Sequence, residues 1–263
     1  MNIRGVLALV KLTWATWFAQ RSFFFILAFG WMIPPLIYMF VWSTAAGEES
    51  IGGFSQGQFI SYYLIFIIVN QITFSTSNWT VGDGIRDGYM NTVLLRPLAP
   101  ITDALANDLA SKGIFILFDL PIVIILALVM KPEIDISTAN ALLFVLALIM
   151  AALLRFLWGY ALALLSFWAT RADSLLAIQD SLIFLLAGQV APVALLPGII
   201  KDVALVLPFR YMVGFPIEVL MGQQSNAEIV SGLVVQFGWL ATTTIVAILI
   251  WNTGIRRYEA VGG

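Results

Sequence analysis

Residues 113–130 read GIFILFDLPIVIILALVM and contain one charged side chain, Asp119. A helix needs roughly 20 mostly apolar residues to cross the hydrocarbon core of a bilayer, so this run is a candidate membrane span. Five other apolar runs in the chain have the same character. Together they predict an all-α integral membrane protein with six transmembrane helices. The expected spans are 22–43, 58–80, 113–130, 139–168, 175–196 and 232–254.

The composition of the whole chain also indicates a bilayer environment. Of its 263 residues, 61% are hydrophobic and 11% are charged, whereas soluble domains carry about 25% charged residues. A soluble fold of this length could not hide so much apolar side chain. The net charge of -2 produces no field that would recruit nucleic acid. We therefore expect the lipid bilayer, and no nucleic acid, among the partners.

The sequence contains no motif for catalysis within this chain. It has no Cys and no His, which removes thiolate metal ligands, the commonest metal ligand and the commonest general base. The phosphate loop G-x-x-x-x-G-K-[ST], the zinc motif H-E-x-x-H and the elbow G-x-S-x-G are absent. Asp119 and Asp180 are the candidates for an intramembrane carboxylate pair, but neither lies in a supporting motif. We expect no catalytic residue, no metal site and no cofactor bound by this chain.

The first 21 residues differ from the spans that follow. They combine Arg4, Lys11 and Arg21 with Trp14 and Trp17. Basic residues with Trp are typical of a helix that lies at the membrane interface, and we predict such a helix here. A cytoplasmic extension of the first span is the alternative. A cleavable signal peptide is not expected, because a compact apolar core followed by small residues is lacking.

Lys and Arg in the loops predict the orientation, since cytoplasmic loops carry an excess of both. With the N-terminus inside, nine basic residues lie on the cytoplasmic side and three lie outside. We therefore expect both termini in the cytoplasm and one membrane domain of residues 1–263. The inner set is Arg4, Lys11, Arg21, Arg86, Arg96, Lys112, Arg171, Arg256 and Arg257, and the outer set is Lys131, Lys201 and Arg210.

Residues 83–100, DGIRDGYMNTVLLRPLAP, are an unusually polar stretch between two spans. They lie within an expected cytoplasmic loop of residues 81–112. Glycines allow tight turns, and a proline disfavours helix at the residue before it. Between these breakers, YMNTVLL predicts a short helix, and Asp103 is a candidate cap for another helix through ALANDLASK. A solvated loop that only obeys the positive-inside rule is the alternative. The breakers are Gly82, Gly84, Gly88, Pro97 and Pro100.

Residues 188–231, which connect the fifth and sixth spans, are mostly apolar yet interrupted by prolines. Each proline removes a backbone donor, and broken backbone at membrane depth persists only where it is buried in protein or lines water. We predict a re-entrant helical hairpin on the extracytoplasmic side. A plain amphipathic loop on the outer leaflet is the alternative. The prolines are Pro192, Pro197, Pro208 and Pro216.

Polar residues within the spans allow two interpretations, helix packing or the lining of a cavity open to the cytoplasm. Asp119 and Arg155 lie in apolar runs at compatible depths. Because an isolated charge in the membrane is costly, we predict an ion pair between them, with snorkelling of Arg155 as the alternative. The candidate residues of a substrate path are Pro34, Pro35, Asn70, Gln71, Ser77, Gly188, Gln189 and Pro192.

Three segments resemble the membrane subunit of type-2 ABC exporters, in the small six-span branch that includes bacterial viologen exporters. IRDGYMNTVLLRPLAP is similar to that branch's pattern of Ile, basic, x, Gly, then Leu-Leu-Arg-Pro-Leu. GQVAPVALLPGIIKDVALVLPF is similar to the run of Gly, Pro, Leu-Pro and Leu-Pro-Phe that the wider family has before its last span, and the C-terminal GIRRYEAVGG is similar to the branch's Gly-x-basic-x-Tyr-x-x-x-Gly ending. Met90 and Asn91 stand where the pattern has Leu-Asp.

The resemblance implies a transmembrane permease subunit in the bacterial cytoplasmic (inner) membrane. Two copies of a cytoplasmic ABC ATPase would hold ATP and Mg, and a second permease, identical or homologous, would complete the dimer. The subunit would export an amphipathic or lipophilic substrate (a drug-like cation, a lipid or a glycan precursor) by alternating access. A non-transporting scaffold or assembly subunit and a proton-coupled secondary carrier are the alternatives. The residues expected to couple to the ATPase are Arg86, Asp87, Gly88, Arg96 and Pro97.

Overall fold

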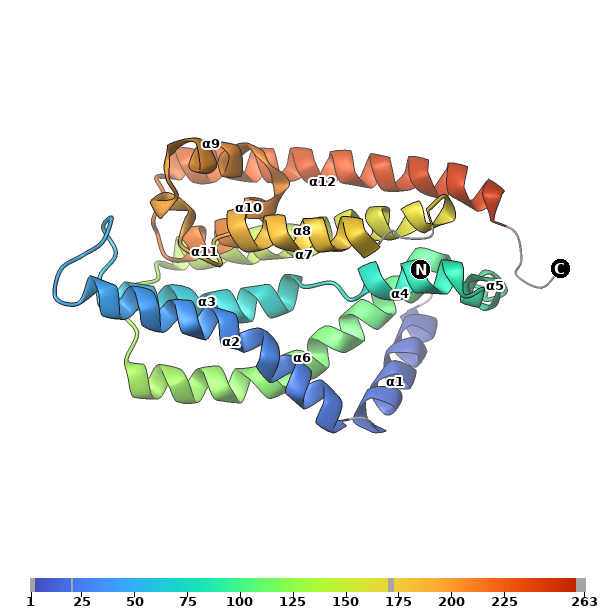
Figure 1. The fold of residues 1–263 in the computed structure, drawn as a ribbon, viewed down its shortest axis with the longest axis horizontal. Helices are drawn as coiled ribbons and strands as arrows, with labels where there is room; N and C mark the ends of the chain where they lie inside the picture. The colour runs from blue at the N-terminus through green and yellow to red at the C-terminus, as the bar shows by residue number, and fades with distance from the viewer. Residues whose placement is uncertain (1–2, 20, 170–172, 259–263) are drawn as a thin grey trace.

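The computed structural model describes residues 3–19, 21–169 and 173–258. The regular elements in these ranges are helices, which confirms the all-α prediction. Several helices run along the long axis of the molecule, another helix crosses one end, and short helices cover the other end (Figure 1). The long-axis helices are α2 (Arg21–Ala46), α3 (Gln56–Thr73), α6 (Pro100–Met130), α7 (Thr138–Leu164), α8 (Asp173–Leu186) and α12 (Asn226–Gly254).

Among the described residues, four helices are long and apolar enough to cross a membrane. Two other helices of the predicted six do not reach that length or hydropathy, since α3 has 18 residues with polar ends and α8 has 14. The prediction of membrane-spanning helices is confirmed for these four by length and composition, and the full set of six spans stays a prediction. The four qualifying stretches are Phe29–Ala46, Pro100–Met130, Thr138–Phe167 and Asn226–Arg257.

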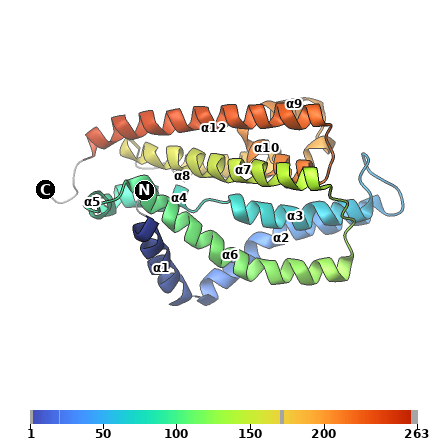
Figure 2. The same ribbon diagram turned by 180° about the vertical axis from the view of Figure 1, so that it is seen from behind.

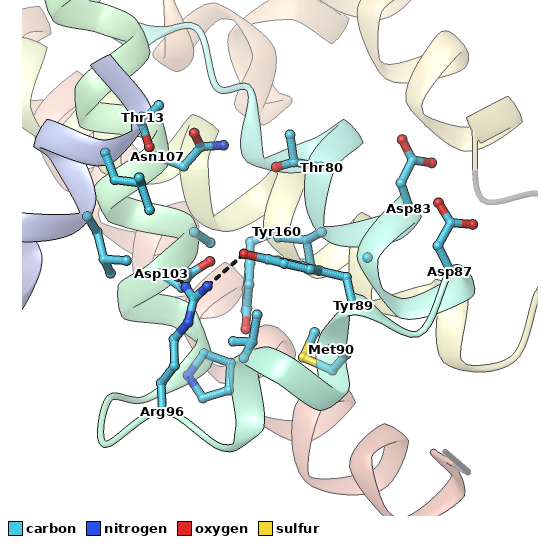
Figure 3. Close-up of a pocket in the computed structure, with 17 residues that line it drawn as sticks. Thr13, Thr80, Asp83, Asp87, Tyr89, Met90, Arg96, Asp103, Asn107 and Tyr160 are labelled. Atoms are coloured by element: carbon cyan, nitrogen blue, oxygen red, sulfur yellow. Dashed lines mark hydrogen bonds and ion pairs between the residues drawn. The ribbon is translucent and has the colours of Figure 1, made fainter. Parts of the chain in front are cut away.

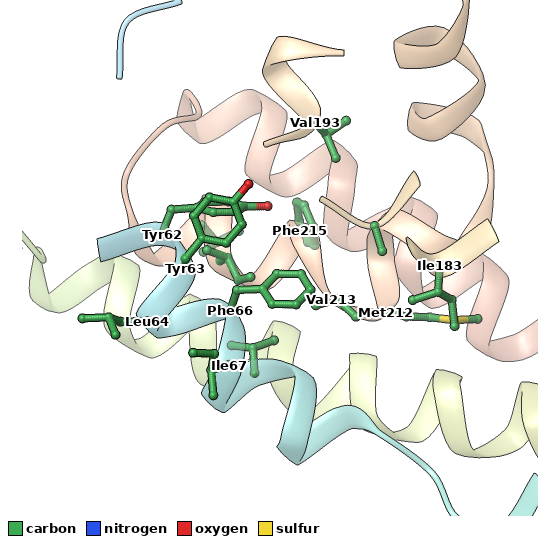
Figure 4. Close-up of a cluster of buried hydrophobic side chains, with 14 of the residues drawn as sticks. Tyr62, Tyr63, Leu64, Phe66, Ile67, Ile183, Val193, Met212, Val213 and Phe215 are labelled. Carbon is green, nitrogen blue, oxygen red and sulfur yellow. The ribbon is translucent and has the colours of Figure 1, made fainter. Parts of the chain in front are cut away.

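Helix α3 lies in the middle of the bundle and carries much of its core. Phe59, Tyr62, Tyr63 and Phe66 are 0% exposed, and Figure 4 shows the two tyrosines and Phe66 beside Phe215 of α11 (Gly214–Leu220). A helix surrounded by protein meets side chains instead of lipid, so it tolerates polar residues that a lipid-facing helix does not. This position explains why α3 is less hydrophobic than its neighbours.

The N-terminal helix α1 (Ile3–Ala19) confirms the predicted helix, and its place at a membrane interface stays a prediction. It packs on α6, where the Trp14 indole nitrogen donates a hydrogen bond to the Ala110 carbonyl at 2.9 Å. Trp14 therefore anchors α1 to the bundle. Both ends of the described chain lie at the same end of the molecule as α4 (Ser77–Arg86) and α5 (Tyr89–Leu94) (Figures 1 and 2).

Two predicted spans run past the ends of their helices. The expected span 58–80 is interrupted, because α3 ends at Thr73 and α4 starts at Ser77. The expected span 175–196 ends early, because α8 stops at Leu186. In contrast, α7 continues into the 3₁₀ helix η1 (Leu165–Phe167) and follows the predicted span 139–168 closely. Helix α12, which continues into η3 (Ile255–Arg257), starts at Asn226, before the predicted residue 232.

The expected loop 81–112 is mostly helical. It contains the end of α4, the predicted short helix as α5, and the first turns of α6, with Pro100 at the first helical position, where a missing N–H costs nothing. Asp103 therefore lies inside α6 and does not cap it, and the N-cap position belongs to Ala99. The predicted cap was wrong because the proline starts the helix earlier.

The connection after α8 consists of short helices, as predicted, and three of its four prolines lie at helix starts. Pro216 is the exception, because it lies inside α11, and the break between α10 and α11 falls at Val213. Pro197 is the N-cap of α9 and Pro208 starts α10, and both positions tolerate a residue without an N–H. Residues 208–220 are buried in the bundle, so their interrupted backbone is enclosed by protein. Re-entry into a membrane stays a prediction. The elements are η2 (Val193–Leu195), α9 (Gly198–Val206), α10 (Pro208–Met212) and α11.

Candidate functional site

Helices α4 and α5 meet at a sharp corner at the end of the bundle. Gly88 forms this corner, with a φ of 78° in the left-handed region that favours glycine. It follows Asp87, the C-cap of α4, and precedes the first residue of α5. The predicted tight turn is therefore confirmed at Gly88. It was wrong at Gly82 and Gly84, which lie within α4.

Arg96 connects α5 to the start of α6 across the turn that contains Pro97. Its guanidinium forms an ion pair with Asp103 and donates a hydrogen bond to the Tyr89 hydroxyl at 2.8 Å (Figure 3). The guanidinium carbon also lies 5.7 Å from the centroid of the Tyr89 ring, within cation–π range. One side chain thus holds α5 against the first turn of α6.

The arginine on α4 is also engaged within the chain. Arg86 forms an ion pair with Asp83, one turn earlier on the same helix. Asp87, next to it, is exposed to solvent. We expected Arg86 and Arg96 to offer donors to carboxylates of a partner, but each is paired with a carboxylate of this chain. Asp83 and Asp87 are both exposed, and Asp87 lies outside the ion pairs of Arg86 and Arg96.

A cavity of about 440 Å³ lies beneath this corner, between α1 and helices α4 to α7. Three carboxylates and one guanidinium line it, so its walls carry excess negative charge and favour a positively charged group. Figure 3 shows Tyr89 and Arg96 reaching toward Asp103 at its edge. The charged and polar lining residues include Thr13, Asp83, Asp87, Arg96, Asp103 and Asn107.

The break between α3 and α4 is held by α6. Asp108 is 0% exposed, accepts a hydrogen bond from the Thr76 backbone N–H at 3.1 Å and forms an ion pair with Lys112. The Thr76 and Ser111 hydroxyls lie 3.2 Å apart in a second hydrogen bond. The start of α4 is therefore fastened to α6 from the side. Sequence reasoning missed Asp108, although Asp and Lys four positions apart on one helix face are a recognisable pair.

Polar side chains at the end of α3 contact both α6 and α7. Arg155 of α7 donates hydrogen bonds to the Asn70 side-chain carbonyl at 2.8 Å and to the Thr73 hydroxyl at 3.0 Å. The Gln71 amide donates to the Asp119 carboxylate of α6. The predicted ion pair between Asp119 and Arg155 was wrong. Helix α3 packs against both α6 and α7, and its Gln71 amide binds Asp119 while its Asn70 amide binds Arg155.

The family model described as ABC-2 family transporter protein matches residues 29–262 of this sequence. The chain belongs to the ABC-2 transporter family. A search of curated proteins found no match to the sequence. Family membership confirms the resemblance seen in the sequence and makes this chain a transmembrane subunit of an ABC transporter. ABC-2 permeases as a family work with an ATPase subunit.

Apart from Ser77, the remaining residues predicted for the substrate path of this ABC-2 protein lie inside α2 or in the segment after α8. Pro34 and Pro35 fall inside α2, which bends along its length in Figure 1, as prolines in a helix interior cause. Gly188 and Pro192 are buried, and Gln189 is partly buried. None of these five lines the cavity beneath the α4–α5 corner. Ser77 starts α4, and its side chain lies outside the described part of the structure.

Aromatic side chains hold the segment after α8 in place. The Tyr62 hydroxyl donates to the Gly188 carbonyl at 2.9 Å. The Val190 carbonyl accepts from the Trp42 indole nitrogen at 2.7 Å and from the Tyr63 hydroxyl at 3.0 Å. Backbone carbonyls that have left a helix are thus satisfied by α2 and α3. The sequence analysis selected Gly188 and Pro192 in this segment, but it did not identify these aromatic hydrogen-bond donors.

Proposed function

We propose that this ABC-2 permease exports an amphipathic or lipophilic substrate by alternating access, driven by a separate cytoplasmic ABC ATPase that docks on α4 and α5. The observation that carries the proposal is the attachment of this corner to α6. Arg96 ties α5 to Asp103, and Asp108 ties the start of α4 to the same helix. Because α6 is long enough to cross a membrane, a push on the corner moves a spanning helix.

The charges at the corner support a partner surface with a basic residue. Asp87 is exposed, and the arginines on either side are paired within the chain. A basic residue of the ATPase can therefore meet Asp87 without breaking an existing ion pair. An exposed pair of this kind contributes about 0.2–1 kcal/mol, so docking also needs the shape of the corner that Gly88 creates.

The assembly that we propose has two ATPase subunits, which hold ATP and Mg, and a second permease, identical or homologous. It resides in the bacterial inner membrane with both termini in the cytoplasm. Two observations support this orientation: the nine-to-three charge asymmetry, and the location of both described chain ends beside α4 and α5 (Figure 2).

The contacts in the bundle support a path for weakly polar molecules. Arg155 and Asp119 are buried and engaged by α3, so neither presents a free charge to a substrate. Drug-like cations, lipids and glycan precursors are the substrate classes compatible with such a path. The apolar spans contain few other ionisable residues.

The test uses the permease expressed together with its ATPase. Arg96→Ala combined with Pro97→Ala should leave ATPase copurification intact, abolish substrate-stimulated ATP hydrolysis and reduce export in the same preparation. Arg257→Ala, which removes an exposed cation at the same end of the molecule, is the matched control and should leave all three unchanged. Unchanged export in the double variant would refute the coupling role.

The wild-type protein separates the alternatives. A scaffold subunit would copurify with the ATPase but support no ATP-dependent uptake into inverted vesicles. A proton-coupled carrier would support uptake without ATP, and an ionophore that collapses the proton gradient would stop it. The proposed exporter requires ATP and tolerates the ionophore.

A further inference from the structure

A second cavity lies at the end of the bundle opposite α4 and α5. Its volume is about 430 Å³, and it is lined by residues of η2, α9, α10, α11 and the first turns of α12. Its walls carry two cationic and two anionic side chains, Lys201, Arg210, Glu218 and Glu228. This distribution differs from that of the cavity beneath the α4–α5 corner, where negative charge is in excess.

Arg210 and Glu218 form a buried wall of this cavity. They are 6% and 5% exposed and form an ion pair, with a second contact of 3.3 Å between the arginine Nε and the carboxylate Oε1. Gln224 donates to the same carboxylate at 2.6 Å, and the guanidinium carbon lies 5.3 Å from the ring centroids of Tyr211 and Phe215. A buried pair with this many partners is fixed in place and electrically neutral as a unit.

The charges left for a ligand are therefore Lys201 and Glu228. Within the part of the chain that the structure describes, Lys201 forms no ion pair. Glu228 uses its Oε2 atom to accept from the Ser225 backbone N–H at 2.8 Å and from the Ser225 hydroxyl at 2.7 Å, and among the described residues no hydrogen bond reaches its Oε1 atom. The side-chain oxygen of Gln224 is buried without a hydrogen-bond partner. The cavity thus offers a cation and, separately, two acceptors.

The rim of the cavity is apolar and exposed. Leu205 and Val235 line the cavity, and each is 37% exposed. The surface continues along α9 through Val206 and Ile199, which are 67% and 81% exposed. On a membrane protein an exposed apolar surface of this kind is suited to contact with acyl chains. A polar cavity that opens beside it matches a lipid, with its headgroup inside and its chains along the helices.

We propose that this cavity binds the phosphoethanolamine headgroup of a membrane lipid, with the phosphate at Lys201 and the ammonium at Glu228 and the Gln224 oxygen. A zwitterionic headgroup places an opposite charge beside both Lys201 and Glu228, whereas an anionic headgroup brings no cation to Glu228. Charge-assisted hydrogen bonds of this kind are the strong ones in proteins. The site does not depend on which substrate the transporter exports.

The test titrates the full-length permease in detergent with dihexanoyl-phosphatidylethanolamine, dihexanoyl-phosphatidylglycerol and free phosphoethanolamine, followed by native mass spectrometry. The ethanolamine lipid should bind tightest. Glu228→Gln should weaken it by about tenfold, as expected when a charged hydrogen-bond acceptor becomes neutral, and leave the glycerol lipid unchanged. The Gln side chain retains the capping box with Ser225, so α12 keeps its start.

Lys201→Gln is the second variant and should weaken both lipids. Asp202→Asn is the matched control, because Asp202 neighbours Lys201 on α9, is exposed and does not line the cavity. Equal binding of the two lipids by the wild type, or wild-type binding by Glu228→Gln, would overturn the proposal. Free phosphoethanolamine that binds as tightly as its lipid would overturn the assignment to a membrane lipid.

Discussion

Arg96 forms an ion pair with Asp103 across the turn that joins α5 to α6. The two side chains are 26% and 21% exposed, so water screens the pair only in part. A second nitrogen of the same guanidinium donates to the Tyr89 hydroxyl. A planar guanidinium reaches two acceptors in fixed directions, and a lysine ammonium on a flexible chain does not reproduce that geometry. Arg96 is therefore a positioning residue for α5.

Arg96→Lys is expected to keep the ion pair with Asp103 and lose the bond to Tyr89. Export should fall while the ATPase still copurifies, and Arg96→Ala should reduce export further. The loss of folding free energy should stay at about 1 kcal/mol or below, because the pair is partly exposed. Efflux, ATPase rate and thermal unfolding of the same preparations check this prediction.

The interaction between the two residues can be isolated by a double-mutant cycle. Arg96→Ala and Asp103→Ala remove the same ion pair, so their effects on export should be less than additive when combined. Tyr89→Phe removes only the second contact and should resemble Arg96→Lys. Fully additive losses for Arg96→Ala and Asp103→Ala would show that the pair does not act as a unit.

The absence of native cysteine makes the orientation directly testable. Glu49, in the loop before α3, and Asp87, at the α4–α5 corner, are both exposed. In intact cells Glu49→Cys should react with an impermeant thiol reagent, and Asp87→Cys should react only after permeabilisation. The opposite pattern would invert the proposed orientation and place the ATPase at the other end.

Local patterns in the sequence were sufficient where neighbouring residues decide the structure. The apolar runs predicted the helical class, and Gly88 with Pro97 marked the limits of α5 because each acts on its own backbone. The sequence also placed the starts of η2, α9 and α10 at Pro192, Pro197 and Pro208, although Pro216 lies inside α11. These features depend on residues a few positions apart.

Prediction from the sequence failed where a residue far along the chain determines a helix boundary or a side-chain contact. The end of α3 at Thr73 accompanies a hydrogen bond from Thr76 to Asp108, which lies on α6. Asp119 and Arg155 were expected to pair because each is an isolated charge in an apolar run. Their true partners, Gln71 and Asn70, are adjacent on α3 and became available only through the packing of three helices.

These hydrogen bonds predict different losses of folding stability when the buried charges of Asp119 and Arg155 are removed. Asp119→Asn keeps an acceptor for the Gln71 amide and removes a buried carboxylate, so folded yield should stay at the wild-type level or rise. Arg155→Gln loses the hydrogen bonds to Asn70 and Thr73 and should cost about 1–3 kcal/mol. Size-exclusion profiles after heating compare the folded fraction of each variant with that of the wild type. A large loss for Asp119→Asn, restored by Arg155→Gln, would revive the ion pair.

The backbone at Gly188 predicts a folding defect for larger residues. Its φ of 88° is left-handed, and an added Cβ would overlap the Tyr62 hydroxyl oxygen. Strain of this kind costs on the order of 1–3 kcal/mol before any clash, so Gly188→Ala should lower the thermal midpoint and the folded yield. Any loss of transport would then follow from the folding defect.

Tyr62→Phe separates the steric overlap with the Tyr62 hydroxyl from the left-handed backbone strain at Gly188. It removes the overlapping oxygen and should recover part of the stability lost in Gly188→Ala, although the left-handed strain remains. Alone, Tyr62→Phe should destabilise, because the buried Gly188 carbonyl loses its donor. Gly198→Ala is the control, since an added Cβ there meets nothing within 4 Å and its φ is not positive. A Gly188→Ala protein as stable as the Gly198→Ala protein would contradict the packing of this segment against α3.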